Sequence, residues 1–155
     1  MLVYRISSTK YANDLSGTGA GLYGGRWNPR GVNLLYTASS ISLACLEYLA
    51  HNFHVMQTTS MCLSKIEIAD DRSIQVIAKN ELPKNWREQS YEPFTTQQLG
   101  LAFSEQAQSY ILKVPSAIVP DEFNYLLNPL HPLHNQSIIR EQIIPFQMDN
   151  RLFGK

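Results

Sequence analysis

Apolar and polar residues alternate along the chain in short segments, and this pattern predicts more strands than helices. The strand pattern recurs over residues 2–6, 34–38, 63–68, 73–77, 110–114, 117–119 and 138–148. Longer segments with a 3.6-residue apolar period predict two helices, one from Ser40 to about residue 53 and one over residues 95–108. Because strands outnumber helices and most connections are short, we expect an α+β fold with a mainly antiparallel sheet and packed helices.

The first predicted helix is apolar on most of its surface. It follows Ser40, a good N-cap residue, and one apolar face carries Ile41, Ala44, Cys45, Tyr48 and Leu49. The rest of the helix also carries apolar residues, namely Leu43, Leu46, Ala50 and Phe53. We therefore expect this helix to be buried on most sides.

Glu47 lies in the middle of this apolar helix. A carboxylate is uncommon in such a setting unless it is paired or takes part in chemistry. A solvated position or a structural ion pair would explain it equally well. A carboxylate placed here can also hydrogen-bond a sugar hydroxyl and stabilise positive charge that develops on a ribosyl ring.

Residues 17–31 hold six of the eight glycines of the chain, around Arg26 and Trp27. A guanidinium group beside a large aromatic ring suits a phosphate or carboxylate ligand that has a ring nearby. Residues 19–24 also match the dinucleotide-binding pattern G-x-G-x-x-G. That pattern is informative only between a strand and a helix, and residues 11–16 do not have the composition of a buried strand. We therefore reject a Rossmann fold.

Length and composition indicate a single domain, because 155 residues can bury a core without disulfides or metal. The thirteen Lys and Arg residues balance the thirteen Asp and Glu residues, which disfavours direct binding to nucleic acid or to an anionic membrane. No signal peptide and no apolar run of membrane-spanning length are present. With Cys45 and Cys62 in separate apolar contexts, these features predict a cytoplasmic protein with reduced thiols.

Ser116 lies between two apolar segments, directly after Pro115, which restricts the backbone there. No G-x-S-x-G pattern surrounds it, so we interpret Ser116 as a hydrogen-bond donor and not as a hydrolase nucleophile.

Two His-x-x-His pairs, His51 with His54 and His131 with His134, lack the glutamate of the H-E-x-x-H zinc pattern. We therefore predict no metal site. His131 lies in a segment, residues 124–132, that combines side-chain amides with a proline-rich turn.

These segments together resemble the RES-domain toxins, which are the toxic members of RES–Xre type II toxin–antitoxin pairs in bacteria. The similarity covers nearly the whole chain and is carried by residues 4–5, 24–28, 35–38, the helix with Glu47, 82–86, 114–117, 124–131 and 149–152. The family takes its name from an arginine, a glutamate and a serine. The matching residues here are Arg26, Glu47 and Ser116, although Ser109 lies close to the last of them.

The resemblance implies that residues 1–155 form one RES domain with a fold similar to that of ADP-ribosyltransferases. It also implies that NAD+ is the substrate, that no prosthetic group is needed, and that depletion of NAD+ arrests growth. The acceptor of the ADP-ribosyl group differs within the family and is phosphate, water or a protein. A cognate Xre-like antitoxin is expected to block the active site and to supply the DNA binding.

The chemistry of the nicotinamide–ribose bond requires a phosphate clamp, a carboxylate and an aromatic surface. We expect Arg26 to bind phosphate, Glu47 to stabilise charge, and Tyr36 or Trp27 to cover a ring. Because the pyridinium nitrogen is already positively charged, no general acid is needed, and one carboxylate can suffice.

The resemblance adds Gly25, Asn128 and His131 as further residues that would bind NAD+. Two other functions remain open. The chain could modify a specific protein with ADP-ribose, or it could be a non-catalytic interaction protein that consumes no NAD+.

Overall fold

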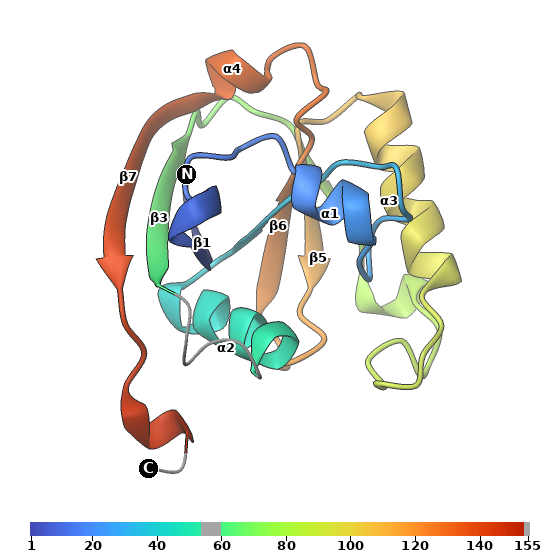
Figure 1. The fold of residues 1–155 in the computed structure, drawn as a ribbon. Helices are drawn as coiled ribbons and strands as arrows, with labels where there is room; N and C mark the ends of the chain where they lie inside the picture. The colour runs from blue at the N-terminus through green and yellow to red at the C-terminus, as the bar shows by residue number, and fades with distance from the viewer. Residues whose placement is uncertain (54–59, 154–155) are drawn as a thin grey trace.

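One sheet runs through the part of the chain described by the computed structural model, which comprises residues 1–53 and 60–153 (Figure 1). Within these ranges seven strands pair in the order β4-β5-β6-β2-β1-β3-β7. The strands are β1 (Leu2–Ser8), β2 (Leu35–Ala38), β3 (Met61–Ile68), β4 (Ile74–Val76), β5 (Ile111–Pro115), β6 (Phe123–Leu127) and β7 (Ile138–Phe146). Only β4 and β5 pair in parallel among them, so the predicted α+β fold with a mainly antiparallel sheet is confirmed.

The helices of the described residues are α1 (Thr18–Tyr23), α2 (Ile41–Asn52), α3 (Phe94–Gln106) and α4 (His134–Ser137). The two long helices, α2 and α3, cover the same face of the sheet. Tyr36 packs against the core cluster under α3, and Ala38 belongs to the cluster under α2. Because side chains two positions apart on a strand share a face, these two clusters lie side by side on that face.

Strands β1 and β2 separate from one another in the centre of the sheet. They pair only at Tyr4 and Ala38, whereas β1 pairs with β3 along its whole length. Residues of both strands, 4–6 of β1 and 36–38 of β2, border a gap on the face that carries both long helices.

Most predicted elements are confirmed, but the segment 117–119 is a loop and not a strand. The Ser116 hydroxyl accepts hydrogen bonds from the amides of Ile118 and Val119, at 3.1 and 3.0 Å. Such a side-chain bond draws the backbone out of an extended ladder. The next strand, β6, instead lies where a turn was expected, and the short helix α1 was not predicted.

The expectation that α2 is buried on most sides is wrong. Leu46 and Phe53 are 41% and 48% exposed, and only Leu43 and Ala44 of the helix are buried. The predicted N-cap is confirmed, because the Ser40 hydroxyl accepts a hydrogen bond from the Leu43 amide at 3.1 Å. The helix lies over the sheet with a single face, which leaves its other faces open to solvent and to the gap.

Helix α3 packs directly on the backbone of the glycine segment, residues 17–31. A Cβ atom at Gly100 would overlap the carbonyl oxygen of Trp27. Gly19 in α1 differs, since a Cβ atom there would meet no other atom within 4 Å. The close approach of α3 to the glycine segment therefore requires glycine at position 100, whereas no packing contact requires glycine at position 19.

We expect Gly100→Ala to destabilise the protein, because the overlap with Trp27 forces α3 away from the glycine segment. The cost should be about 1–3 kcal/mol, as for other overpacked positions. The matched control Gly19→Ala should leave stability unchanged or raise it by up to about 1 kcal/mol, because alanine is the better helix former. Urea denaturation of the two variants checks this, and equal stabilities would contradict the packing described here.

Candidate active site

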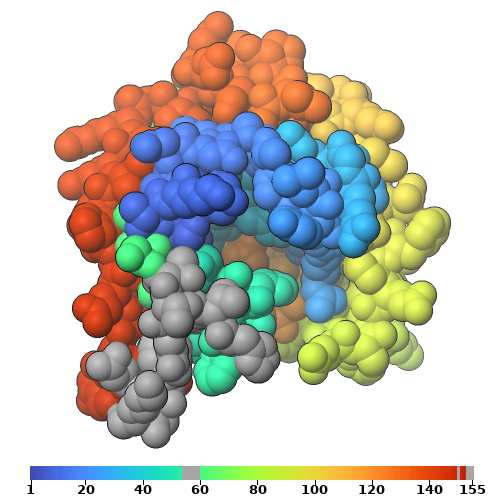
Figure 2. Space-filling view, viewed as in Figure 1, coloured from blue at the N-terminus to red at the C-terminus, as the bar shows by residue number. Residues whose placement is uncertain are grey.

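A cleft of about 690 Å³ lies on the sheet face between α2 and the glycine segment. Its walls also include parts of β1, β2 and the connections that carry Arg87 and Ala117. Figure 2 shows the surface hollowed between the blue glycine segment, the teal α2 and the yellow-green residues that precede α3. A cleft of this volume is typical of sites that bind small molecules.

Glu47 points from α2 into a network of polar side chains beside the cleft. Its Oε1 accepts hydrogen bonds from Ser116 Oγ at 2.8 Å and from Asn124 Nδ2 at 2.6 Å. No group of the described residues donates a hydrogen bond to Oε2. Because Glu47 lines the cleft, this second oxygen is available to a ligand. The interpretation as a structural ion pair fails, since neither partner is charged.

Ser116 donates a hydrogen bond to Glu47 but does not itself line the cleft. Its side chain is 2% exposed. The hydroxyl oxygen receives two backbone amides, which leaves its hydrogen to point at Glu47. The sequence-based interpretation of Ser116 as a hydrogen-bond donor is confirmed, and Ser116 acts as a positioning residue for the carboxylate.

Arg26 lies in the cleft wall contributed by the glycine segment. Its Nη1 donates to the carbonyl oxygen of Trp86, and the guanidinium lies over the Tyr91 ring at 5.8 Å from the centroid. One bond fixes the guanidinium in place, and its other N–H groups remain available to an anion. A guanidinium with free N–H groups can bind a phosphate or a carboxylate.

The Tyr36 hydroxyl is held by two consecutive residues of the glycine segment. Its hydroxyl donates to Asn28 Oδ1 at 2.7 Å and accepts from the Trp27 amide at 3.1 Å. Burial raises the pKa of the Tyr36 hydroxyl, and the Glu47 charge raises it further, against opposing effects of the Trp27 amide and Arg26. Tyr36 therefore stays protonated at neutral pH and is a fixed hydrogen-bonding group in the cleft wall.

Gly25 is required by this arrangement, because a Cβ atom there would lie 2.7 Å from the Tyr36 hydroxyl and 2.9 Å from Asn28 Oδ1. Both distances are shorter than Cβ contacts in folded proteins. Its role is to admit these two side chains, and its backbone borders the cleft.

The structure corrects the expectation that the Trp27 indole covers a ligand ring. The side chain is 3% exposed and packs on Trp86, with ring centroids 6.0 Å apart. It belongs to the core under α3. Trp27 and Tyr36 both border the cleft, but of the two only Tyr36 has a partly exposed side chain.

Asn128 and His131 lie away from the cleft, which corrects their proposed contact with NAD+. The Asn128 side chain is fully buried, donates to the Ser104 carbonyl at 3.0 Å and accepts from the Leu130 amide at 3.0 Å. His131 accepts a hydrogen bond from the Leu133 amide. The residues follow the far end of β6, about 13 Å along the strand from Asn124.

Asn124 is the amide of this segment that reaches the site, and sequence reasoning did not select it. Asn124 and Asn128 are four positions apart, so the alternation of a strand places both on one face. The strand itself was not predicted, because the segment was interpreted as a turn. Arg87, which lines the cleft, was also missed.

No cluster of three or more metal-binding side chains occurs in residues 1–53 and 60–153. His134 Nδ1 lies 2.9 Å from the Tyr110 hydroxyl, and burial lowers the pKa of His134. The pair of His51 and His54 cannot be assessed, because His54 lies outside the described residues. No helix in the described ranges is both long and apolar enough to cross a bilayer.

Positive charge dominates the lining of the cleft. Arg5, Arg26 and Arg87 border it, whereas Glu47 is the only acidic residue among the described residues that do. All three guanidinium groups donate to backbone carbonyls, and such bonds leave their positive charge in place. The cleft therefore favours an anionic ligand, with Glu47 as its one negative group.

The fold and the site define a small α+β protein with one carboxylate facing an arginine-lined cleft. A family model described as the RES domain matches residues 2–149 of the chain. The chain therefore belongs to the RES domain family, and the resemblance to RES-domain toxins is confirmed.

Two curated relatives illustrate the similarity. The chain is 40% identical over 153 residues to a protein called Toxin Res from Yersinia enterocolitica (serotype O:8, biotype 1B), across 98% of this chain and 99% of the relative. It is also 40% identical over 128 residues to the Prs ADP-ribosylating toxin of Sphingobium sp. (strain YBL2), across 80% of this chain and 78% of that protein.

A solved structure shares the fold. A chain in the crystal structure of the M. tuberculosis MbcT–MbcA toxin–antitoxin complex superposes with a TM-score of 0.72 and 18% identity. The match covers 93% of this chain and 84% of that chain. At this identity the likeness concerns the fold alone.

We expect Ser116→Ala to destabilise the protein by about 1–3 kcal/mol, because the partly buried backbone amides of Ile118 and Val119 lose their acceptor. The control is Ser42→Ala on the exposed side of α2, for which we expect a change within about 0.5 kcal/mol. Chemical denaturation measures both. A Ser116→Ala variant as stable as the control would show that its hydroxyl does not hold the loop.

Proposed function

We propose that this chain is the toxin of a bacterial toxin–antitoxin pair and that it cleaves the nicotinamide–ribose bond of NAD+. The observation that carries the proposal is the Glu47 carboxylate, with Oε1 fixed by Ser116 and Asn124 and Oε2 free of hydrogen bonds from the described residues. The family membership and the names of the relatives support the toxin assignment.

The proposed reaction breaks the bond between ribose C1′ and the pyridinium nitrogen. The bonding electron pair goes to nitrogen, which releases neutral nicotinamide and leaves an oxocarbenium-like ribosyl group. Glu47 accepts a hydrogen bond from a ribose hydroxyl through Oε2 and stabilises the positive charge that develops on the ring. An acceptor oxygen then bonds to C1′ and loses a proton.

Arg26 would bind the diphosphate of NAD+. Its guanidinium is fixed on one side by the Trp86 carbonyl and by the Tyr91 ring, so little conformational entropy is lost on binding. The excess of positive charge in the cleft supports an anionic substrate. Tyr36, whose hydroxyl is already fixed by Asn28 and Trp27, would form part of the surface beside the sugar or the ring.

For the acceptor we propose phosphate or water, which makes the protein an NAD+ phosphorylase or glycohydrolase that depletes NAD+ and arrests growth. The alternative is transfer of ADP-ribose to a specific protein. The name of the Sphingobium relative, an ADP-ribosylating toxin, favours this second reaction. Both reactions need the same Glu47 and Arg26 and differ only in what attacks C1′.

We further propose that an Xre-like antitoxin binds the toxin and blocks the cleft. The structural neighbour comes from a toxin–antitoxin complex, which supports a protein partner of this kind. The free thiols of Cys45 and Cys62 suit the reducing cytoplasm, where we place the activity.

We expect the purified protein to convert NAD+ to nicotinamide, and Glu47→Gln to lower kcat by about a hundredfold or more. This is the loss seen when one electrostatic stabiliser is removed, about 2.7–4 kcal/mol. Glutamine keeps an oxygen for Ser116 and Asn124, so the melting temperature should change little. Chromatography of the reaction products with and without phosphate identifies the acceptor.

A wild-type protein that consumes no NAD+ under either condition, and that labels no protein with ADP-ribose, would contradict the enzymatic proposal and favour a non-catalytic interaction protein. A Glu47→Gln variant that turns over normally would show instead that Glu47 is a scaffold residue. The thermal melt of the same preparation excludes misfolding as the cause of lost activity.

In cells we expect induction of the wild-type chain to stop growth and lower the NAD+ pool, because no partner then covers the cleft. Co-expression of the Xre-like antitoxin encoded beside it should restore both. Induction of Glu47→Gln is the control for the burden of expression. Growth arrest with an unchanged NAD+ pool would favour modification of a specific protein over depletion.

A further inference from the structure

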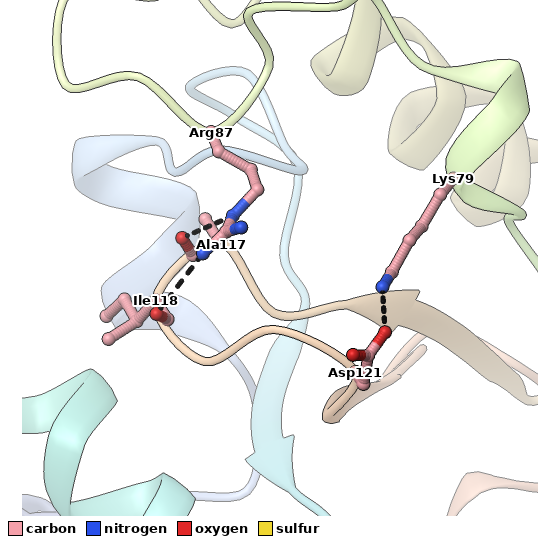
Figure 3. A network of polar contacts seen from close by, with 5 residues as sticks. All are labelled: Lys79, Arg87, Ala117, Ile118 and Asp121. Carbon is pink, nitrogen blue, oxygen red and sulfur yellow. Dashed lines mark hydrogen bonds and ion pairs between the residues drawn. The ribbon is translucent and has the colours of Figure 1, made fainter.

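Arg87 holds the loop that follows Ser116. Figure 3 shows its guanidinium directed at two consecutive backbone carbonyls of this loop. Nε donates to the Ala117 carbonyl at 3.0 Å, and Nη2 donates to the Ile118 carbonyl at 3.4 Å. Among the described residues, no other group donates to either carbonyl.

The same loop is held from its inner side by Ser116. The amides of Ile118 and Val119 turn inward to the Ser116 hydroxyl, while the carbonyls of Ala117 and Ile118 turn outward to Arg87. With both sides of the backbone fixed, the hydroxyl hydrogen of Ser116 has a defined direction toward Glu47. Arg87 is therefore connected to the carboxylate through a single loop.

Arg87 is also adjacent to the residue that fixes Arg26. The Trp86 carbonyl accepts a hydrogen bond from Arg26, and the Trp86 indole is buried against Trp27. Trp86 thus contacts Arg26 on one wall of the cleft, and the next residue, Arg87, contacts the loop after Ser116 on the other wall. The buried indole gives this connection a rigid base.

We propose that Arg87 is a positioning residue that sets the geometry of Ser116 and Glu47 relative to Arg26. The predicted loss of kcat rests on the NAD+-cleaving function proposed above. The predicted effect on the loop after Ser116 does not depend on that function. Because Arg87 lines the cleft, direct binding of the substrate diphosphate is the competing role, and the two roles predict different kinetics.

A positioning role predicts that Arg87→Ala lowers kcat by about ten- to a hundredfold, the range expected for a displaced catalytic group, with KM nearly unchanged. In a Ser116→Ala background the same substitution should cause little further loss, because the two residues act through one loop. Arg87→Lys should recover part of the activity, since an ammonium group can reach one of the two carbonyls.

The matched control is Lys79→Ala. Lys79 contacts the same loop only through the side chain of Asp121 and bonds neither of the two carbonyls that Arg87 holds (Figure 3). The contacts of Arg87 and Lys79 are both solvent-exposed, so the comparison isolates the bonds to the loop backbone, and we expect kcat of Lys79→Ala to stay within about twofold of the wild type.

A second measurement does not depend on activity. Amide hydrogen exchange should be faster at Ile118 and Val119 in Arg87→Ala and unchanged in Lys79→Ala. Unchanged exchange in Arg87→Ala would overturn the proposal. So would a raised KM with normal kcat, which would assign Arg87 to substrate binding, or a full additional loss in the Ser116→Ala background. If the wild type consumes no NAD+, the proposed function fails and exchange alone decides the role of Arg87.

Discussion

The hydrogen bonds that converge on one oxygen of Glu47 are the interaction on which the site depends. They join α2 to the loop after β5 and to the start of strand β6, which lie 69 and 77 residues further along the chain. By occupying Oε1, Ser116 and Asn124 fix the plane of the carboxylate without neutralising it, because both donors are uncharged. The other oxygen can then face a ligand with its charge undiminished. A carboxylate held by an arginine would be equally well placed, but its charge would be offset.

The remainder of the fold places an anion-binding group across from this carboxylate. The separation of β1 and β2 leaves room on the sheet face, and the glycine segment brings Arg26 to the opposite wall. Gly25 and Gly100 let that segment approach Tyr36 and α3 closely, so its path is set by packing. The residues before α3 tie both walls together through Trp86 and Arg87. In the proposed function, the diphosphate of NAD+ would bind at Arg26 and the nicotinamide-bearing ribose would lie at Glu47.

The sequence predicted the regular elements well, because apolar periodicity and the Ser40 cap are local signals. It also selected Arg26, Glu47 and Ser116, through a local chemical argument and a family resemblance, and the structure brings Glu47 and Ser116 into contact. Prediction from the sequence failed where contacts between distant segments decide whether a residue is helical or buried. The six-residue helix α1 lies between Gly17 and Gly24 at φ 67° and 73°, and its composition is that of a loop. Trp27 and Asn128 carry plausible ligand-binding groups, but both side chains are buried in the core. Trp27 still borders the cleft, whereas Asn128 does not.

The central claim is that the free oxygen of Glu47 faces the reacting ribose while Arg26 holds the diphosphate. A crystal structure of the Glu47→Gln variant with NAD+ tests this most directly, since that substitution should preserve the hydrogen bonds from Ser116 and Asn124 and slow cleavage. The account predicts a hydroxyl of the nicotinamide-bearing ribose hydrogen-bonded to the side chain at position 47, with the diphosphate on the guanidinium of Arg26. NAD+ bound outside the cleft, or bound within it with the nicotinamide-bearing ribose away from position 47, would contradict it.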